Sequence, residues 1–394
     1  MKGNIQRRGP NSWRIRFDVP GINQRKQVSE TVRGSKRDAQ RILRDRLASI
    51  DKGVYVEKTN ESTSEYLNRW IEYHSMNVSL RTVVGYRTCI KKLDKHIGAK
   101  PLQKLRPEHI QKAYTTILQS GLSARTVLHS HRVLNKALTE AVKWGILVYN
   151  PLEAVTPPRV RKKEPSTWTP KVIRKFLNLA KNSRYYNAYR LAALTGMRRS
   201  ELAGIKWGDV DLELGRLKIV RTRQRIPGHG VVVGQPKSHR SQRSIALSPV
   251  GISVLENTRS RQAEIRLKAG GAWTNTDYVF TVEDGLPIDP NSLSQEFRRI
   301  VRKYKLPYGT LHGLCHSFAT SLLSANVHPA VVQSALGHSS ISVTIDTYSH
   351  VMPGLEEAAA RQIDEALNLT LAESSLPFCN HAHLGVFSLV LKIP

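Results

Sequence analysis

The chain has 394 residues, 40% of them hydrophobic, and 61 Lys and Arg against 31 Asp and Glu give a net charge of +30 and a pI near 10.3. This length predicts two or three domains rather than one. The charge predicts a polyanionic partner, because neutralising phosphates releases their condensed counterions. The basic residues are spread along the chain instead of gathering on one amphipathic helix, which disfavours a membrane surface and favours nucleic acid.

Cysteine usage and the chain termini indicate the compartment. Cys89, Cys315 and Cys379 are odd in number and far apart, so no disulfide framework is predicted. The first residues contain no apolar stretch of signal-peptide length, and the apolar run at 384–393 is too short to span a bilayer. We therefore expect a reducing, cytoplasmic and nucleoid-associated setting, with no membrane partner.

Residues 1–55 are expected to form a small basic module. Residues 12–19 alternate apolar with charged side chains, as a half-buried strand does, and residues 24–31 can return as a second strand. Ser35 is expected to cap a helix that follows. The first 50 residues carry 13 basic and 4 acidic side chains, a net charge of +9. We predict that Arg14 and Arg16 contact DNA, the alternative being a solvated terminal domain.

Residues 60–155 predict a compact block of four helices. The sequence Ser62-Thr63-Ser64-Glu65 has the capping-box pattern ahead of an apolar run. A second helix is expected over 81–96, a third from Pro107, and a longer fourth helix that stops at Gly145. Residues 156–165 then form a basic, proline-containing linker able to follow a phosphate backbone. In that linker we predict DNA contacts from Arg161, Lys162 and Lys163.

Residues 166–368 are the largest predicted unit, and residues 369–394 form an irregular tail without a functional interpretation. The unit is mostly helical, with strands expected at 217–222, 231–234 and 243–247. The predicted fold class is therefore mainly α with small β-sheets (α+β), in several domains.

Two segments of this unit resemble signature motifs of the tyrosine recombinase (phage integrase) family. Residues 193–202, Ala-Leu-Thr-Gly-Met-Arg-Arg-Ser-Glu-Leu, are similar to the first motif, whose arginine clamps the scissile phosphate in that family and is Arg198 here. A guanidinium stays charged and pairs with two phosphate oxygens, and a turn at a helix start favours this role over that of a surface arginine such as Arg199. Residues 235–245 resemble the family's hairpin, with Lys237 at the catalytic lysine. One lysine alone is a weak signal, and its weight comes from its order among the other motifs.

Three further matches follow in the order that the family shows. Residues 311–320 resemble the His-x-x-Arg-His motif, with His312 in its first position, but Cys315 stands where the family has its second arginine. Residues 336–340 match a Leu-Gly-His motif through His338, and residues 344–350 match the nucleophile segment through Tyr348. His312 and His316 with Cys315 between them also suggest a zinc site, but the glutamate of zinc-protease motifs is missing. We expect a structural role for His316.

The resemblance implies a reaction and its partners. Tyr348 attacks a DNA phosphate and forms a 3′-phosphotyrosyl link, which conserves the bond energy. His312 helps to take the tyrosine proton, Lys237 protonates the leaving 5′ oxygen, and Arg198 and His338 stabilise the phosphorane. No metal or cofactor is implied. The implied partners are double-stranded DNA at core-type and arm-type sites, a homo-tetramer on DNA, and an accessory bending or directionality factor.

The departure at Cys315 leads to a hypothesis of its own. The substitution removes a positive fork from the phosphate site, so we expect a chain that binds DNA and cleaves it slowly or not at all. A degenerate element, a deliberately trapped variant, and rescue by a cation such as Lys305 or Arg302 all remain open as explanations. The competing functions are a DNA-binding protein without catalysis and a type IB topoisomerase.

Overall fold

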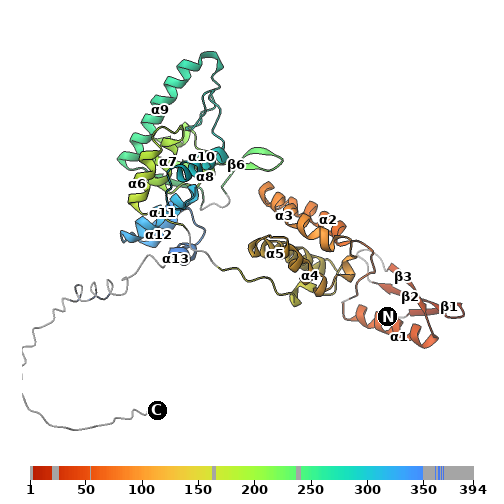
Figure 1. The fold of residues 1–394 in the computed structure, drawn as a ribbon. Coiled ribbons are helices and arrows are strands. Elements are labelled where there is room, and N and C mark those ends of the chain that lie inside the picture. The colour runs from red at the N-terminus through yellow and green to blue at the C-terminus, as the bar shows by residue number, and fades with distance from the viewer. Residues whose placement is uncertain are drawn as a thin grey trace, which may run out of the picture. The chain divides into compact units, whose positions relative to one another are not determined.

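The computed structural model describes residues 3–19, 26–53, 55–161, 166–236 and 241–348, together with four separate positions between 360 and 367. The chain divides into two compact units, one mainly Met1–Lys163 and the other mainly Glu164–Arg225 with Val231–Pro394. Helices predominate and the strands form small antiparallel sheets (Figure 1), which confirms the predicted α+β class.

The first unit begins with a three-stranded antiparallel sheet in the order β1-β2-β3, which one helix covers. The elements are β1 (Gly3–Gly9), β2 (Ser12–Val19), β3 (Lys26–Arg33) and α1 (Lys36–Asp51). Ile15 and Phe17 of the central strand are buried against α1, whose first turn is closed by the predicted Ser35 cap. The sequence did not predict β1, because its residues are mostly polar or glycine and the strand stays largely exposed.

The rest of the first unit is a bundle of helices around a separate apolar core. Its helices are α2 (Thr63–Ser75), α3 (Leu80–Leu93), the π-helix η1 (Asp94–Gly98), η2 (Leu102–Lys104), α4 (Pro107–Gln119), α5 (Ala124–Lys143) and η3 (Pro151–Ala154). The capping box at Ser62 and Glu65 and the helix start at Pro107 are confirmed. Two buried aromatic side chains tie α2 to α5, since the Tyr66 hydroxyl donates to the Ala137 carbonyl at 2.6 Å and the Trp70 indole donates to a carboxylate on the same helix.

One glutamine side chain fixes the segment that joins α1 to α2 on the helical bundle. Gln103 Nε2 donates to the Glu57 carbonyl at 2.7 Å and to the Ile146 carbonyl at 3.1 Å. Its Oε1 accepts from the Thr59 amide at 3.1 Å. All three bonds use backbone groups, so they hold the path of the chain and do not depend on the neighbouring side chains.

The second unit contains the remaining elements. They are α6 (Pro170–Leu179), α7 (Tyr186–Thr195), α8 (Arg199–Leu202), η4 (Trp207–Asp209), β4 (Val210–Asp211), β5 (Arg216–Ile219), β6 (Thr222–Ile226), β7 (Gly230–Gly234), β8 (Arg243–Ala246), α9 (Pro249–Ala269), η6 (Gly270–Ala272), α10 (Pro290–Lys303), α11 (Leu311–Ser324), α12 (Pro329–Leu336) and α13 (Ile341–Tyr348). The prediction of a single strand at 217–222 is wrong, because two strands of different sheets occupy this segment. The chain leaves the sheet β4-β5-β8 after Ile219, and β6 pairs with β7 in a separate hairpin.

Two apolar clusters hold the second unit together. In the larger one, the rings of Phe176 on α6 and Phe297 on α10 lie 4.5 Å apart, and Trp168 and Tyr189 pack around them. The smaller cluster joins α11, α12 and α13. Its buried members are Cys315, Ala319, Leu323, Val332, Leu336 and Tyr348. The residues of the third, fourth and fifth sequence motifs therefore share one local core.

Candidate active site

Arg198 stands at a sharp turn between two helices, as the sequence predicted. Helix α7 ends at Gly196, which has the left-handed backbone angles φ 63° and ψ 17°. A Cβ at this position would lie 2.5 Å from the Phe318 ring, so both the conformation and the space require glycine. Arg198 is then the N-cap of α8, and about 30% of its side chain is exposed. The turn therefore places a partly exposed guanidinium at the N-terminus of α8.

A buried carboxylate and a second arginine hold Arg198 in place. Arg198 Nη1 donates to Glu201 Oε1 at 2.8 Å, and Nη2 donates to the Gly337 carbonyl at 3.3 Å. Arg243 of β8 donates from both Nη atoms to the two Glu201 oxygens at 3.1 and 3.0 Å, and from Nε to the Ala335 carbonyl at 2.7 Å. Burial alone would raise the pKa of Glu201, but the hydrogen bonds and charges of the two arginines outweigh it and lower that pKa. The carboxylate is therefore ionised, and it links α8 and β8 to the end of α12.

Helix α11 contributes two histidines in successive turns. His312 and His316 are four residues apart, so they share a face of the helix, and their rings lie 4.8 Å apart edge to face. Burial is the main cause that lowers the pKa of His312, and the positive charge of Arg198 adds to it. Both His312 and Arg198 therefore belong to one electrostatic neighbourhood, as the sequence predicted.

Tyr348 ends α13 and has no exposed surface. Its hydroxyl lies 2.6 Å from Nδ1 of His316, not of His312. Burial raises the pKa of Tyr348 well above the ordinary value of a phenol. The sequence assigned the tyrosine to the reaction and gave His316 only a structural role, but the structure brings these two side chains into direct contact.

His338 follows α12 at a left-handed glycine and completes the cluster. Gly337 closes the helix with φ 63° and ψ 45°, and His338 Nδ1 lies 2.9 Å from Thr344 Oγ1 on α13. Burial first, and then the charges of Arg198 and Arg243, lower the pKa of His338 to about 4. At neutral pH the imidazole is uncharged, so it can offer a hydrogen bond but no full positive charge.

Cys315 belongs to the same small apolar cluster as Tyr348 and is almost fully buried. Burial raises the pKa of its thiol to about 11, so the group is neutral at pH 7 and supplies neither a cation nor a thiolate. The charged groups that act on this thiol are Arg198, Glu201 and Arg243. Lys305 and Arg302, which the sequence suggested as rescuing cations, are not among these groups.

The structure describes only some of the other residues that the sequence singled out. Lys237, Lys162 and Lys163 fall outside the described residues, and Arg161 is exposed. Arg14 and Arg16 are half-buried and alternate along β2 with the core residues Ile15 and Phe17, so they occupy the face of the sheet opposite to α1.

Two kinds of feature are absent from the described segments. No group of three or more His, Cys, Asp or Glu side chains is placed there to hold a metal ion. None of the helices described is long and apolar enough to cross a membrane.

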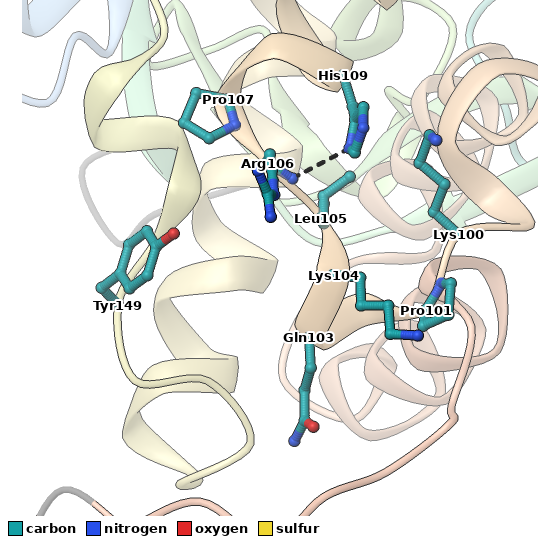
Figure 2. Close-up of a pocket in the computed structure, with 9 residues that line it drawn as sticks. All are labelled: Lys100, Pro101, Gln103, Lys104, Leu105, Arg106, Pro107, His109 and Tyr149. Atoms are coloured by element: carbon teal, nitrogen blue, oxygen red, sulfur yellow. Dashed lines mark hydrogen bonds between the residues drawn. The ribbon is translucent and has the colours of Figure 1, made fainter. Parts of the chain in front are cut away.

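The helical bundle carries a basic cavity of about 670 Å³ that the sequence did not indicate (Figure 2). It lies beside η2 and the first turn of α4, with Tyr149 facing it from the opposite side. The basic residues that line it are Lys100, Lys104, Arg106 and His109. Among the described residues, Lys100, Lys104 and Arg106 form no ion pair with a carboxylate. The cavity therefore concentrates positive charge around an open hollow, beside the N-terminus of a 13-residue helix.

Comparisons with known proteins agree with this site. The family model described as "Phage integrase family" matches residues 167–354, and that described as "Phage integrase, N-terminal SAM-like domain" matches residues 63–118, together more than half of the chain. The chain belongs to the phage integrase family of tyrosine recombinases.

Relatives and solved structures of this family cover most of the chain. A "Tyrosine recombinase XerC-like" protein of Caldanaerobacter subterraneus subsp. tengcongensis is 27% identical over 92% of this chain and 98% of its own length. The ICEBs1 integrase of Bacillus subtilis is 26% identical over 70% of this chain and 76% of its own. The Tn1549 transposon integrase in complex with transposon right end DNA has the same fold, with a TM-score of 0.67 at 22% identity over 78% of this chain and 99% of that one.

Proposed function

We propose that this chain breaks and rejoins DNA at specific sites through a covalent 3′-phosphotyrosyl link formed by Tyr348. The observation that supports this most is the convergence of Arg198, His312, His338 and Tyr348 in one cluster, although they come from segments 150 residues apart in sequence. Cleavage of a phosphodiester by a side chain needs a permanent positive charge, neutral hydrogen-bond donors and a nucleophile at one point. These side chains supply each of them without a metal ion.

Each group has a role in this proposal. Arg198 pairs with the non-bridging oxygens of the scissile phosphate, and His312 and His338 donate hydrogen bonds to the charge that develops there. Lys237 gives a proton to the 5′ oxygen that leaves. The neutral Cys315 leaves the phosphate with one full positive charge fewer than the family motif provides, so we propose that cleavage is slow.

Double-stranded DNA is the proposed partner, with a core-type site for the helical bundle and the second unit. The basic sheet of the N-terminal module, through Arg14 and Arg16, and the linker, through Arg161, Lys162 and Lys163, supply further phosphate contacts. We propose an arm-type site for the N-terminal module, a homo-tetramer during strand exchange, and an accessory factor that bends DNA or sets direction. Solved relatives include complexes with DNA, such as the lambda integrase dimer bound to a COC′ core site.

The test begins by selecting, from a random duplex library, the DNA that this chain binds. A nicked form of that duplex, called here the nicked selected duplex, traps the covalent protein–DNA adduct because the short 5′ fragment diffuses away. The chain is expected to form this adduct slowly, and Tyr348→Phe is expected to bind the duplex equally well and form none. An adduct that persists in Tyr348→Phe, or a selected site without paired inverted repeats, contradicts the proposal.

Cys315 favours a second candidate, a DNA-binding protein derived from an integrase but without catalysis. That function predicts tight binding to the selected duplex and no adduct from the native chain or from Cys315→Arg.

A type IB topoisomerase relaxes supercoiled DNA but does not exchange strands between two duplexes, so a two-duplex exchange assay separates it from a recombinase.

The basic cavity gives a prediction about binding. If Lys100 and Lys104 contact phosphates, Lys100→Ala/Lys104→Ala is expected to make the slope of log K against log salt about 1.8 units shallower, because each phosphate contact contributes about 0.9. Fluorescence anisotropy on the selected duplex across a salt series measures this slope. Lys181→Ala/Lys268→Ala removes the same charge from two exposed positions of the second unit. An equal change in both double variants indicates only a net-charge effect and rejects the cavity as a DNA contact.

A further inference from the structure

The nucleophile of the proposed reaction has a hydrogen-bond partner, His316, for which the sequence predicted only a structural role. The Tyr348 hydroxyl and His316 Nδ1 are 2.6 Å apart, and their ring centroids are 5.8 Å apart. We infer that His316 is a catalytic residue that accepts the proton of Tyr348 as the tyrosine attacks the phosphate. This inference rests on the proposed function and adds a residue to it.

The placement of His316 follows from the helix on which it lies. His312 and His316 are one turn apart on the same face of α11, and His316 is the one whose Nδ1 lies within hydrogen-bond distance of the Tyr348 hydroxyl at the end of α13. The positive charge of Arg198, the arginine proposed to bind the phosphate, lowers the pKa of His312. His316 is instead within hydrogen-bond distance of the tyrosine oxygen. The two histidines therefore have different roles: His312 acts on the phosphate, and His316 acts on the nucleophile.

The protonation state of His316 suits this role. Burial is the main cause that lowers the pKa of His316 to about 4, and His312 on α11 and His338 beyond α12 add to the effect. The ring is neutral at pH 7, and in the tautomer that carries its proton on Nε2 the Nδ1 lone pair accepts from the Tyr348 hydroxyl, which is the tautomer the inference requires. The titratable and charged groups that act on the two side chains are Cys315, His312, His338 and Arg198, and Cys315 is a neutral thiol.

The step balances as a transfer between atoms already in contact. The Tyr348 oxygen forms a bond to phosphorus, its proton moves to His316 Nδ1, the bond from phosphorus to the 5′ oxygen breaks, and that oxygen takes a proton from Lys237. The imidazolium that forms lies next to the growing negative charge of the phosphorane. In the rejoining step, the 5′ hydroxyl attacks phosphorus and gives its proton back to Lys237, the bond from phosphorus to the tyrosine oxygen breaks, and His316 returns its proton to that oxygen.

The contact itself can be tested without DNA. Nitrogen NMR of the full chain with labelled histidine reports hydrogen bonding at each ring nitrogen, with His312→Gln and His316→Gln used for assignment. Tyr348→Phe removes the hydroxyl and is expected to shift the Nδ1 signal of His316 and to leave that of His312 in place. A shift at His312 with none at His316 overturns the inference.

The catalytic role is tested by adduct formation under single-turnover conditions on the nicked selected duplex, in the native chain and in a Cys315→Arg background. His316→Gln is expected to lower the rate by about 10²–10⁴-fold in whichever background reacts, whereas His96→Gln, an exposed histidine of the helical bundle, has no effect. A second substrate carries sulfur in place of the bridging 5′ oxygen, and this leaving group needs no proton. The sulfur substrate is expected to restore the rate of adduct formation in Lys237→Ala but not in His316→Gln. A His316→Gln variant that reacts at the parent rate, or that sulfur restores, overturns the inference.

The pH profile supplies a readout that loss of folding alone does not give. Because the pKa of His316 is about 4, the native rate is expected to stay level from about pH 7 down to about pH 5, where a histidine with an ordinary pKa near 6.5 is mostly protonated. A tenfold fall across that range in the parent chain contradicts a role for His316. If neither background forms any adduct on either substrate, the proposed function fails and the catalytic role fails with it, while the NMR result still decides whether the contact exists.

Discussion

Cys315→Arg is expected to raise the rate of adduct formation on the nicked selected duplex by about 10²–10³-fold, because it restores one preorganised cation to the proposed phosphate site. The native thiol is buried and its pKa is about 11, so it contributes no charge of either sign. Among the described residues, Arg198 has a guanidinium that is both close to this position and partly exposed, whereas Arg243 is committed to Glu201. Arg198 and the proposed Lys237 therefore face a transition state from which the second arginine of the family motif is missing.

Two other substitutions at Cys315 separate charge from shape. Cys315→Lys supplies a charge without a bidentate fork and is expected to recover part of the rate. Cys315→Met has a comparable length without a charge and is expected to react at the native rate or more slowly. Equal rates for the native chain and Cys315→Arg show that the missing arginine does not limit the reaction.

The new arginine also enters a packed region, and this has a measurable cost. Cys315 contacts the apolar cluster formed by Ala319, Leu323 and Tyr348, so a longer side chain must leave the cluster toward Arg198 or strain it. We expect Cys315→Arg to unfold at a lower temperature than the native chain while reacting faster with DNA. Thermal unfolding recorded beside the rate shows whether a failure to gain activity reflects a failure to fold.

The motifs allowed the main elements of the site to be predicted because each is local in sequence. Gly196 and Gly337 are needed for left-handed turns, and each turn directs the residue that follows it, so a short pattern was sufficient to place Arg198 and His338. The capping boxes and the proline at the start of α4 are equally local, and these helix starts lie where the sequence predicted them.

Contacts between distant segments could not be predicted in the same way. The pairing of His316 with Tyr348 depends on how α13 packs on α11, and the link from Arg243 to Glu201 depends on where β8 ends beside α8. One sequence signal was available for the first contact, since His316 follows His312 by one helical turn on the same face. The break between β5 and β6 could not be predicted either. Val220 and Arg221 lie between the two sheets, but nothing in their local sequence interrupts a strand pattern.

Arg243→Met is expected to lower the free energy of unfolding of the second unit by about 3–5 kcal/mol, because it leaves a carboxylate buried with one of its two cations removed. The side chains of Glu201 and Arg243 are 2% and 5% exposed, so water cannot replace the lost partner. Hydrogen exchange at peptides from β8 and α12 in the full chain measures the loss where the contact lies. Arg299→Met breaks an exposed pair with Glu296 on α10 and is expected to have little effect.

The same network predicts a dependence on pH with a definite sign. The pKa of Glu201 is lower in the folded chain than in the unfolded one, so the stability it contributes is complete above the unfolded value of about 4.3 and is lost as the pH falls through the folded value. The difference in unfolding free energy between the native chain and Glu201→Gln is therefore expected to shrink below about pH 4. A difference that stays constant down to pH 2 contradicts an ionised Glu201.

A double variant distinguishes stability from the position of Arg198. Glu201→Leu/Arg243→Met removes both buried charges, so it is expected to regain much of the stability that Arg243→Met loses. It cannot restore the carboxylate that accepts from the Arg198 guanidinium and backbone amide at 2.8 Å each. Adduct formation by this double variant, measured in the Cys315→Arg background, is therefore expected to stay low although the chain is folded. Recovery of the rate together with the stability means that the pair serves the fold alone and that Arg198 reaches the phosphate without its support.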